Sequence, residues 1–546
     1  MRLASLAALS LLLASAADAQ FARVTDAVQP LGATNRPEQS TFVPFEGEMV
    51  FRGIDDSGDI ALWTTDGTDA GTAPLVTTPG APPDNPSAPF TVLDGDLYFS
   101  GLDASGDNLL WLLSPGGGIP ERVLTGGATH VAGTFARVDD VAYFTACTDD
   151  EGCEPWTTNG QSSALLQDVR PGPGSSDARG YTPWQGAVYF TADGADQQGR
   201  EPWRTVGTAG TTTLLIDLYR GSTSSRVQGF FGGSDGLYFV GEGREIAAST
   251  TRPGLWRSSG VPGDTSLVVS GGLLTSILGE VDGTILLAYP DDAVGIEPHR
   301  VSGNSAVLLA DINPGSVGSL GGPVPTRLAF DDQFVFTAQS RDGFFQVDQI
   351  WMTDGATATQ ITVPDAPSPA SYTKPVVLDG ALYFMVRDRG TGTTQPDEAW
   401  RIEAPGADPE RVGALPDGLE VTDWVPAGDR LLASVALGLS ETELWTLTPP
   451  PPVATEASPE AALDLCAFPS PTSGPVSVRF SLADSGDARV TVHDALGREV
   501  ARLADGPHAS GEHTAIWTPE ALASGVYLVR LASGAGAVTQ TVVVTR

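Results

Sequence analysis

Histidine is the side chain that most often transfers protons near neutral pH, and this sequence contains only five. His493, His508 and His513 lie close to the C-terminus, and His130 stands alone. His299 takes a place where a repeat described below otherwise has tryptophan, so we expect it to pack rather than catalyse. No nucleophile elbow, His-Glu-x-x-His pair or phosphate-cradling glycine loop occurs. The sequence therefore favours a protein that is not an enzyme, without deciding the point.

Short acidic clusters are the second group of residues that could do chemistry. They are Asp55-Asp56-Ser57-Gly58-Asp59, Asp103-Ala104-Ser105-Gly106-Asp107, Asp149-Asp150-Glu151 and Asp291-Asp292. Clustered carboxylates suit Ca²⁺, which takes six to eight oxygen ligands, but none of these clusters has the spacing of a known calcium loop. Asp and Gly are also the residues that tight turns require. Turn formation is the favoured interpretation, with Ca²⁺ at these hairpins as the alternative and no other cofactor expected.

Two of the three cysteines, Cys147 and Cys153, flank a polar turn. In an oxidising compartment this spacing predicts a local disulfide at a hairpin tip, while two free thiols are the alternative. Cys466 is left without an assigned role.

The N-terminus indicates such a compartment. Residues 1–19 have the form of a secretory signal peptide, with Arg2, an apolar run over residues 6–13 and the cleavage sequence Ala17-Asp18-Ala19. The run is too short to span a bilayer, and no later segment qualifies, so no transmembrane segment is expected. The net charge of −37 disfavours nucleic acid as a partner.

The elements that must position these residues repeat along the chain. A turn followed by a short apolar run recurs nine times, at intervals of 45 to 49 positions. The runs end at Phe51, Phe99, Phe144, Phe190, Phe239, Leu287, Phe336, Phe384 and Ala433. A second run follows each of them and carries a tryptophan, as at Trp63, Trp156 and Trp203, or His299 in its place.

Each unit holds about four short strands bounded by turn residues, which is typical of a β-propeller blade. A β-solenoid has shorter repeats and a chain of sandwiches has longer units. We therefore predict an all-β fold in which residues 20–448 form a large propeller of eight or nine four-stranded blades. The last unit lacks a closing strand, and residues 23–28 resemble one, so the N-terminal strand is expected to complete the last blade.

The repeat resembles a family of bacterial secreted proteins with tandem Glu-Leu-Trp-x-x-Asp-Gly-Thr-x-x-Gly-Thr motifs. Residues 62–72 are the nearest copy, and other copies, such as that around His299, are degenerate. The resemblance implies a propeller-like scaffold and supplies no catalytic residue.

A proline-rich linker, residues 449–462, separates the repeats from a segment with alternating strand patterns. Residues 463–546 are predicted to form a small Ig-like β-sandwich. They resemble the type-A C-terminal sorting domain of the Bacteroidota type IX secretion system, with a generic adhesion module as the alternative. The residues that match its motifs are Pro469, Pro471, Gly474, Asp494, Gly497, Arg498, Gly525, Tyr527 and Arg546. This resemblance implies the type IX machinery as a partner and a secreted or cell-surface location.

Two functions are consistent with these features. The first is a non-enzymatic propeller that binds an extracellular protein or glycan through loops on one face. The second is a secreted hydrolase of polysaccharides that uses Asp/Glu pairs at the propeller channel.

Overall fold

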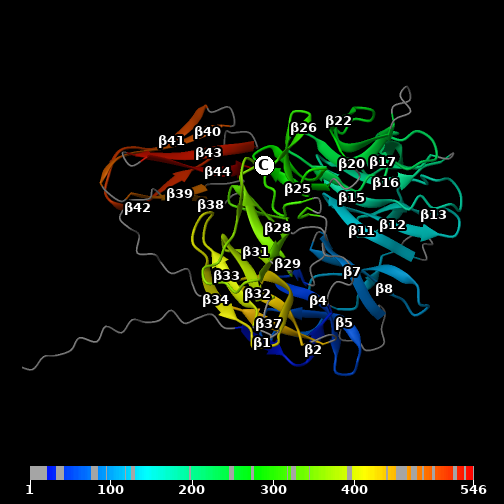
Figure 1. Ribbon diagram of the computed structural model, residues 1–546, viewed down its shortest axis with the longest axis horizontal. Helices are drawn as coiled ribbons and strands as arrows, with labels where there is room; N and C mark the ends of the chain where they lie inside the picture. Colours follow the sequence, from blue (N-terminus) through cyan, green and yellow to red (C-terminus); the bar gives the residue numbers. More distant parts are fainter. Residues whose placement is uncertain are drawn as a thin grey trace, which may run out of the picture. The chain divides into compact units, whose positions relative to one another are not determined.

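The computed structural model of the chain consists of short β-strands (Figure 1). It describes residues 21–31, 42–75, 84–93, 95–116, 118–123, 130–160, 162–195, 198–244, 251–271, 276–315, 318–320, 327–342, 345–389, 396–437, 441–449, 464–468, 476–482, 485–494, 498–519, 525–533 and 536–544. The predicted signal peptide and all but the first residue of the predicted linker lie outside these residues. Over the described ranges the chain forms no α-helix, only one 3-10 turn (Ala209–Thr211), and therefore no helix that could cross a membrane.

The chain divides into two compact units, Met1–Pro450 and Pro451–Arg546. The described part of the first unit contains nine antiparallel sheets, numbered 1 to 9 in chain order. Sheet 1 holds β2 (Val28–Pro30), β3 (Phe42–Phe45), β4 (Glu48–Asp55), β5 (Ile60–Thr65) and β6 (Ala73–Pro74). Sheet 2 holds β7 (Asp84–Leu93), β8 (Asp96–Leu102), β9 (Asn108–Leu113) and β10 (Glu121–Arg122). Sheet 3 holds β11 (His130–Val138), β12 (Val141–Thr148), β13 (Gly152–Thr158) and β14 (Ser163–Leu165).

The next sheets repeat this order of strands. Sheet 4 holds β15 (Arg179–Trp184), β16 (Ala187–Asp193), β17 (Arg200–Thr205) and β18 (Thr213–Leu214). Sheet 5 holds β19 (Phe230–Gly232), β20 (Leu237–Arg244), β21 (Thr251–Ser258) and β22 (Thr265–Ser270). Sheet 6 holds β23 (Ser276–Val281), β24 (Thr284–Asp291), β25 (Gly295–Ser302) and β26 (Ser305–Leu308). Sheet 7 holds β27 (Arg327–Phe330), β28 (Gln333–Asp342), β29 (Phe345–Thr353) and β30 (Ala358–Gln360).

Sheets 8 and 9 complete the first unit. Sheet 8 holds β31 (Ala370–Leu378), β32 (Ala381–Asp388), β33 (Glu398–Ile402) and β34 (Glu410–Ala414). Sheet 9 holds β35 (Glu420–Ala427), β36 (Arg430–Ala436), β37 (Thr442–Leu447) and, at its edge, β1 (Phe21–Thr25). The first described strand is thus hydrogen-bonded to a sheet more than four hundred residues away, with Phe21 opposite Leu447. The sequence predicted that residues 23–28 complete the last unit; the strand that does so is Phe21–Thr25, and Val28 pairs instead with β4 of sheet 1.

One register recurs in all nine sheets. The residue that ends each predicted first run lies directly opposite the tryptophan of the second run, as Phe144 does to Trp156 and Phe190 to Trp203. In sheet 6 the same pair is Leu287 and His299. All nine residues that end the first runs have an exposed fraction of 0%. The repeat spacing therefore located the centre of every sheet.

The core of the first unit lies between sheets rather than within them. Nine hydrophobic clusters occur in its described part, and each joins one sheet to the next. The cluster of Val24, Phe51 and Leu432 joins sheet 9 back to sheet 1. Figure 1 accordingly shows the blue strands β4 and β5 beside the yellow strand β37. Because each sheet buries apolar side chains on both faces, it depends on both of its neighbours for stability.

The second unit has two sheets and its own core. One sheet holds β38 (Asp464–Phe468), β39 (Val476–Leu482) and β42 (Gly511–Trp517). The other holds β40 (Gly486–Asp494), β41 (Glu499–His508), β43 (Gly525–Ser533) and β44 (Gly536–Val544). Val478 and Phe480 of the first sheet share a buried cluster with Val490 and Val529 of the second. The two sheets therefore pack against each other through inward-facing side chains.

Candidate functional site

The acidic hairpins use their carboxylates to shape turns. Asp55 Oδ1 accepts hydrogen bonds from the backbone N–H groups of Ser57 (2.8 Å) and Asp59 (3.0 Å). Asp103 does the same for Ser105 and Asp107. Among the residues that the structure describes, no group of three or more His, Cys, Asp or Glu side chains is arranged to hold a metal ion. The geometry thus shows the turn chemistry expected of Asp at these positions.

His299 is buried, with an exposed fraction of 2%. Its ring packs against Tyr289 at a centroid distance of 5.1 Å, and its Nδ1 lies 2.8 Å from the carbonyl oxygen of Glu297. Burial lowers the pKa of the imidazole. His299 therefore packs in the buried position that tryptophan occupies in the other repeats. Its place in the repeat had predicted this packing role.

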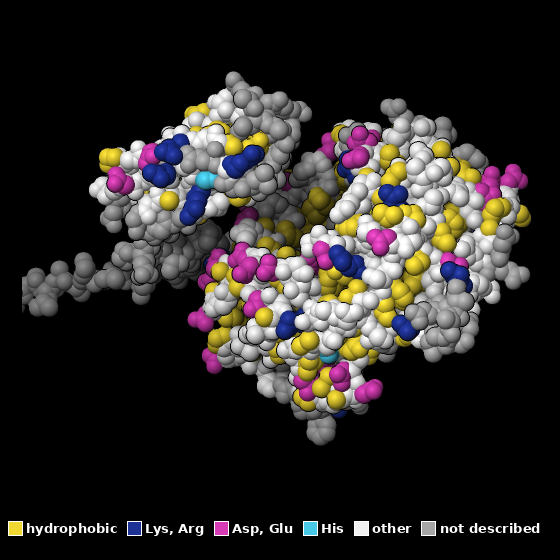
Figure 2. Space-filling view, turned by 90° about the horizontal axis from the view of Figure 1, so that it is seen from above, with side chains coloured by type: hydrophobic (Ala, Val, Ile, Leu, Met, Phe, Trp, Pro, Cys, Tyr) yellow, Lys and Arg dark blue, Asp and Glu magenta, His cyan; other side chains and the backbone are white. Residues whose placement is uncertain are grey.

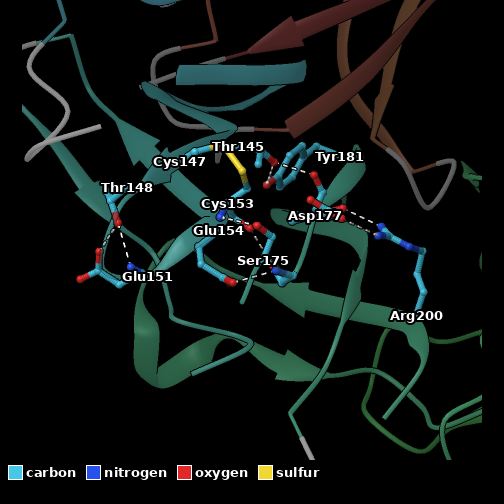
Figure 3. Close-up of a disulfide and its surroundings, with 12 residues drawn as sticks. Thr145, Cys147, Thr148, Glu151, Cys153, Glu154, Ser175, Asp177, Tyr181 and Arg200 are labelled. Carbon is cyan, nitrogen blue, oxygen red and sulfur yellow. Dashed lines mark hydrogen bonds and ion pairs between the residues drawn. A yellow bond between two sulfur atoms is a disulfide. The ribbon is translucent and has the colours of Figure 1, made fainter. Parts of the chain in front are cut away.

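Cys147 and Cys153 form the predicted disulfide (Figure 3). They lie opposite each other on β12 and β13, next to the turn that joins these strands. The backbone N–H of Cys153 donates to Ser175 Oγ, and its carbonyl oxygen accepts from the N–H groups of Ser176 and Asp177. The disulfide therefore closes a hairpin against the loop that leads to sheet 4. Cys466 lies on β38, opposite Arg479.

A buried glutamate holds the same loop through hydrogen bonds. Glu154, directly after Cys153, is fully buried, and its two carboxylate oxygens accept hydrogen bonds from the N–H groups of Val169 (2.9 Å) and Ser176 (2.8 Å). These bonds hold both ends of loop 169–176, which we call loop A. Because buried backbone N–H groups are costly to leave unpaired, the carboxylate takes the place of a missing strand partner.

The arrangement recurs in two further units. Glu201 accepts from the N–H of Leu218 (3.0 Å), at the start of loop 218–225, which we call loop B. The N–H groups of Arg200 and Ser225 attach the far end of loop B to sheet 4. In sheet 6, Glu297 accepts from the N–H groups of Ile312 and Asn313 and from the hydroxyl of Ser319.

Burial raises the pKa of these carboxyl groups because it removes water from the charged form. The pKa of Glu154 rises to about 7 and that of Glu201 to about 8, although hydrogen bonds from the N–H groups of Ser176 and Leu218 act in the opposite direction. The pKa of Glu297 is raised for the same reason. These three glutamates were missed as a group in the sequence. The signal was present, since each precedes Pro-Trp or Pro-His and is followed by a Leu-Leu-x-Asp segment with a serine-ended loop.

An open cleft of about 630 Å³ lies between loops A and B. Arg170 and Pro171 of loop A form one side, and Ser222 and Ser224 of loop B form the other. The hairpin between β16 and β17 completes the lining with Asp193, Gly194, Ala195, Gln198 and Gly199. Sheet 4 therefore carries a polar depression at its end, walled by the loops that enter and leave it.

Asp193, which lines the cleft, is paired with Arg200 of β17. Arg200, only 9% exposed, donates to Asp193 Oδ2 (2.8 Å) and to the carbonyl oxygen of Asp177 (2.6 Å). Figure 3 shows Arg200 reaching Asp177, on the same stretch of chain as Ser175. Elsewhere on the first unit, acidic side chains recur over the visible surface (Figure 2). The described part of the lining therefore combines one exposed guanidinium, that of Arg170, with one neutralised carboxylate, that of Asp193.

The residues of the predicted sorting motifs fall in the second unit. Gly525 begins β43, and Tyr527 is buried against Trp517 with ring centroids 5.5 Å apart. Asp494 ends β40 opposite Tyr527, and Arg498 is exposed just before β41. Pro469, Pro471, Gly474, Gly497 and Arg546 lie outside the described residues.

Comparison with protein families identifies this second unit. Residues 466–545 match the model of the secretion system C-terminal sorting domain. The protein is exported. This match confirms the type IX sorting domain predicted from the sequence, and the domain implies an interaction with the type IX machinery. No match was found among curated proteins.

Several solved structures are distantly similar to the chain. The surface component PorZ of the type IX secretion system of Porphyromonas gingivalis is 11% identical, with 96% of this chain and 100% of that chain covered and a TM-score of 0.20. The β-propeller domain of the trilobed protease of Pyrococcus furiosus is 8% identical, with 60% and 94% covered and a TM-score of 0.31. A puromycin hydrolase is 12% identical, with 65% and 58% covered and a TM-score of 0.34. This chain thus covers less than two thirds of the hydrolase, and similarities this distant say nothing of its activity.

Proposed function

We propose that residues 20–448 form a nine-bladed β-propeller that acts outside the cell as a non-enzymatic binding scaffold. The nine sheets would be the blades, and the cluster between sheets 9 and 1 would close the ring. The strand β1 would complete the last blade from the other end of the chain. Propellers usually have four to eight blades, so nine would be more than usual.

We also propose that the sorting domain is an Ig-like sandwich. Its two sheets share one buried cluster, as in other small β-sandwiches. The domain would direct the protein through the type IX machinery and leave the propeller on the cell surface or in the medium.

The observation that supports binding over catalysis is the use of the carboxylates around the cleft. Glu154 and Glu201 are bonded to backbone N–H groups, and Asp193 is paired with Arg200. A glycosidase needs one carboxyl group to protonate the leaving group and a second to act as base or nucleophile. Side chains that are already bonded to the scaffold suit a rigid recognition surface better.

The purified propeller, residues 20–448, would be applied to arrays of glycans and of extracellular proteins and incubated with a panel of polysaccharides. We expect saturable binding on an array and no release of reducing ends. Hydrolysis of any polysaccharide that is lost on replacing an Asp or Glu would establish the alternative, a secreted hydrolase. Absence of binding on every array would overturn the proposed function.

Calcium at the acidic hairpins is a separate proposal. It predicts that Ca²⁺ raises the melting temperature of the propeller and that Asp55→Asn together with Asp103→Asn removes the increase. Identical melting curves in Ca²⁺ and in chelator would exclude a role for Ca²⁺ in stability.

A further inference from the structure

The cleft over sheet 4 has walls that are fixed before any ligand arrives. Loop A is held by the Glu154 carboxylate and by the backbone of the disulfide-linked Cys153. Loop B is held by Glu201 and, through Ser224 Oγ, by the N–H of Arg200 (3.0 Å). At Gly199, a side chain would meet backbone atoms of Thr223 at 2.5 Å, so the hairpin and loop B are in direct contact. A preformed cleft spares a ligand the cost of ordering loops.

The lining can donate and accept hydrogen bonds in several directions. The exposed Arg170 guanidinium donates one hydrogen bond to the carbonyl oxygen of Ser175 in loop A and has further N–H groups. The Gln198 amide can both donate and accept. Ser222 and Ser224 of loop B also line the cleft, and the Ser224 hydroxyl, which accepts from the N–H of Arg200, keeps its own proton to donate. Asp193 keeps a side chain 28% exposed although Arg200 neutralises its charge. A ligand rich in hydroxyl groups could pair with every one of these groups.

The same lining disfavours the other classes of ligand. None of the described residues that line the cleft is aromatic or a large aliphatic, and Pro171 and Ala195 are the largest apolar side chains among them. A bound peptide would therefore find no pocket for the anchoring side chains that dominate protein interfaces. A polyanion would find one unpaired guanidinium, on a protein whose net charge is −37.

We propose that this cleft is a binding site for an uncharged, hydroxyl-rich segment of an extracellular glycan. Its volume lies in the range of small-molecule sites and can hold a short oligosaccharide. The proposal rests on the proposed binding function and adds to it the place and the chemical class of the ligand. Without an aromatic face for stacking, selectivity comes from hydrogen bonds of Arg170, Gln198 and the two serines.

The test measures binding of neutral tetrasaccharides of glucose, xylose and mannose to the full mature chain by titration calorimetry. Arg170→Ala removes the donor, and Ser222→Leu fills the cleft without adding an aromatic ring. Neither residue belongs to the Arg200–Asp193 pair. Ser105→Leu makes the same change at an exposed serine outside the cleft, between β8 and β9 of sheet 2, and is the control. We expect each cleft variant to weaken binding by about tenfold or more, a change of about 1.4 kcal/mol, and the control to bind like the parent.

The outcomes separate the site from the function. If a neutral oligosaccharide binds equally well to the parent and both cleft variants, the cleft is not the site and the binding function stands. If only uronate-containing oligosaccharides or only peptides bind, the ligand class is wrong. If neither the arrays nor the titrations detect any ligand, the proposed function itself fails. Unchanged melting temperatures of both variants establish that a loss of binding is not a loss of fold.

Discussion

At the scale of single residues, the buried carboxyl groups should make the stability of this protein depend on pH. The pKa of Glu201 in the folded state, about 8, lies above its ordinary value of 4.5 because the side chain is buried and Asp217 is nearby. The folded state therefore binds the proton more tightly than the unfolded state. The stability that this provides is complete below the unfolded pKa and is lost as the pH rises through the folded pKa.

We expect the free energy of unfolding to fall between about pH 5 and pH 8, with Glu201 contributing roughly 3–5 kcal/mol of the loss. Glu201→Gln, which cannot ionise, should flatten the curve, whereas the exposed Glu121→Gln should leave it unchanged. The measurement is urea unfolding at a series of pH values. Parallel curves for the parent and Glu201→Gln would mean that the carboxyl group is ionised throughout.

The tryptophan anchors carry the second prediction at this scale. Trp156 is 4% exposed and shares a cluster with Leu110 of sheet 2 and Phe144 of its own sheet. Trp156→Ala should therefore lower the free energy of unfolding by roughly 3–5 kcal/mol, because it leaves a cavity between two sheets. Ile119, 67% exposed, is the control, and Ile119→Ala should change stability by less than about 0.5 kcal/mol. A small loss at Trp156 would argue that sheets 2 and 3 do not rely on each other.

At the scale of elements, spacing and residue type predicted a great deal. The repeat predicted the central residues of each sheet, such as the pair Phe144 and Trp156, because large apolar side chains are buried where a sheet packs on both faces. The disulfide followed from two cysteines around a polar turn in an exported chain. The recurring Glu-Pro-Trp pattern marks the positions of Glu154 and Glu201, but it does not tell which distant N–H groups in loops A and B these carboxylates hold. The cleft depends on three loops coming together, and no local pattern encodes that.

The disulfide hairpin gives a prediction for an element. Cys147 and Cys153 close a short loop, so chain-entropy arguments assign the bond only about 2 kcal/mol of stability. The double variant Cys147→Ser and Cys153→Ser should stay folded and melt at a modestly lower temperature. Because the hairpin contacts loop A, proteolysis within residues 169–176 should become faster than in the parent. Cleavage of loop A at the parental rate in the double variant would show that Glu154 alone is sufficient to hold it.

At the scale of the whole molecule, the two ends of the first unit depend on each other. β1 places Phe21 in the cluster between sheets 8 and 9, and Val24 in the cluster between sheets 9 and 1. Deleting residues 21–30 should therefore cost roughly 5 kcal/mol or more and lower the melting temperature sharply. Adding a synthetic peptide of the same ten residues should restore part of the loss. An unchanged melting curve after the deletion would show that the first unit is held closed without β1.

The sorting domain is predicted to be separable from the rest of the chain. Its core is a cluster formed within its own two sheets, and the chain divides at Pro450. Removing residues 450–546 should therefore leave the melting temperature of the first unit unchanged while stopping passage across the outer membrane, so that the protein accumulates in the periplasm. A reporter placed between the signal peptide and residues 450–546 should reach the surface or the medium in a host with the type IX machinery.

The truncated protein and the reporter fusion would be fractionated in the same host, with and without a functional type IX machinery. The result decides whether the domain is a sorting signal or an adhesion module. An address read by the machinery must be necessary in the truncated protein and sufficient in the fusion. An adhesion module that only accompanies the propeller would be neither, and the truncated protein would then still appear in the medium. Because the truncation removes a unit with its own core, a folded protein retained in the periplasm would reflect the lost address rather than misfolding.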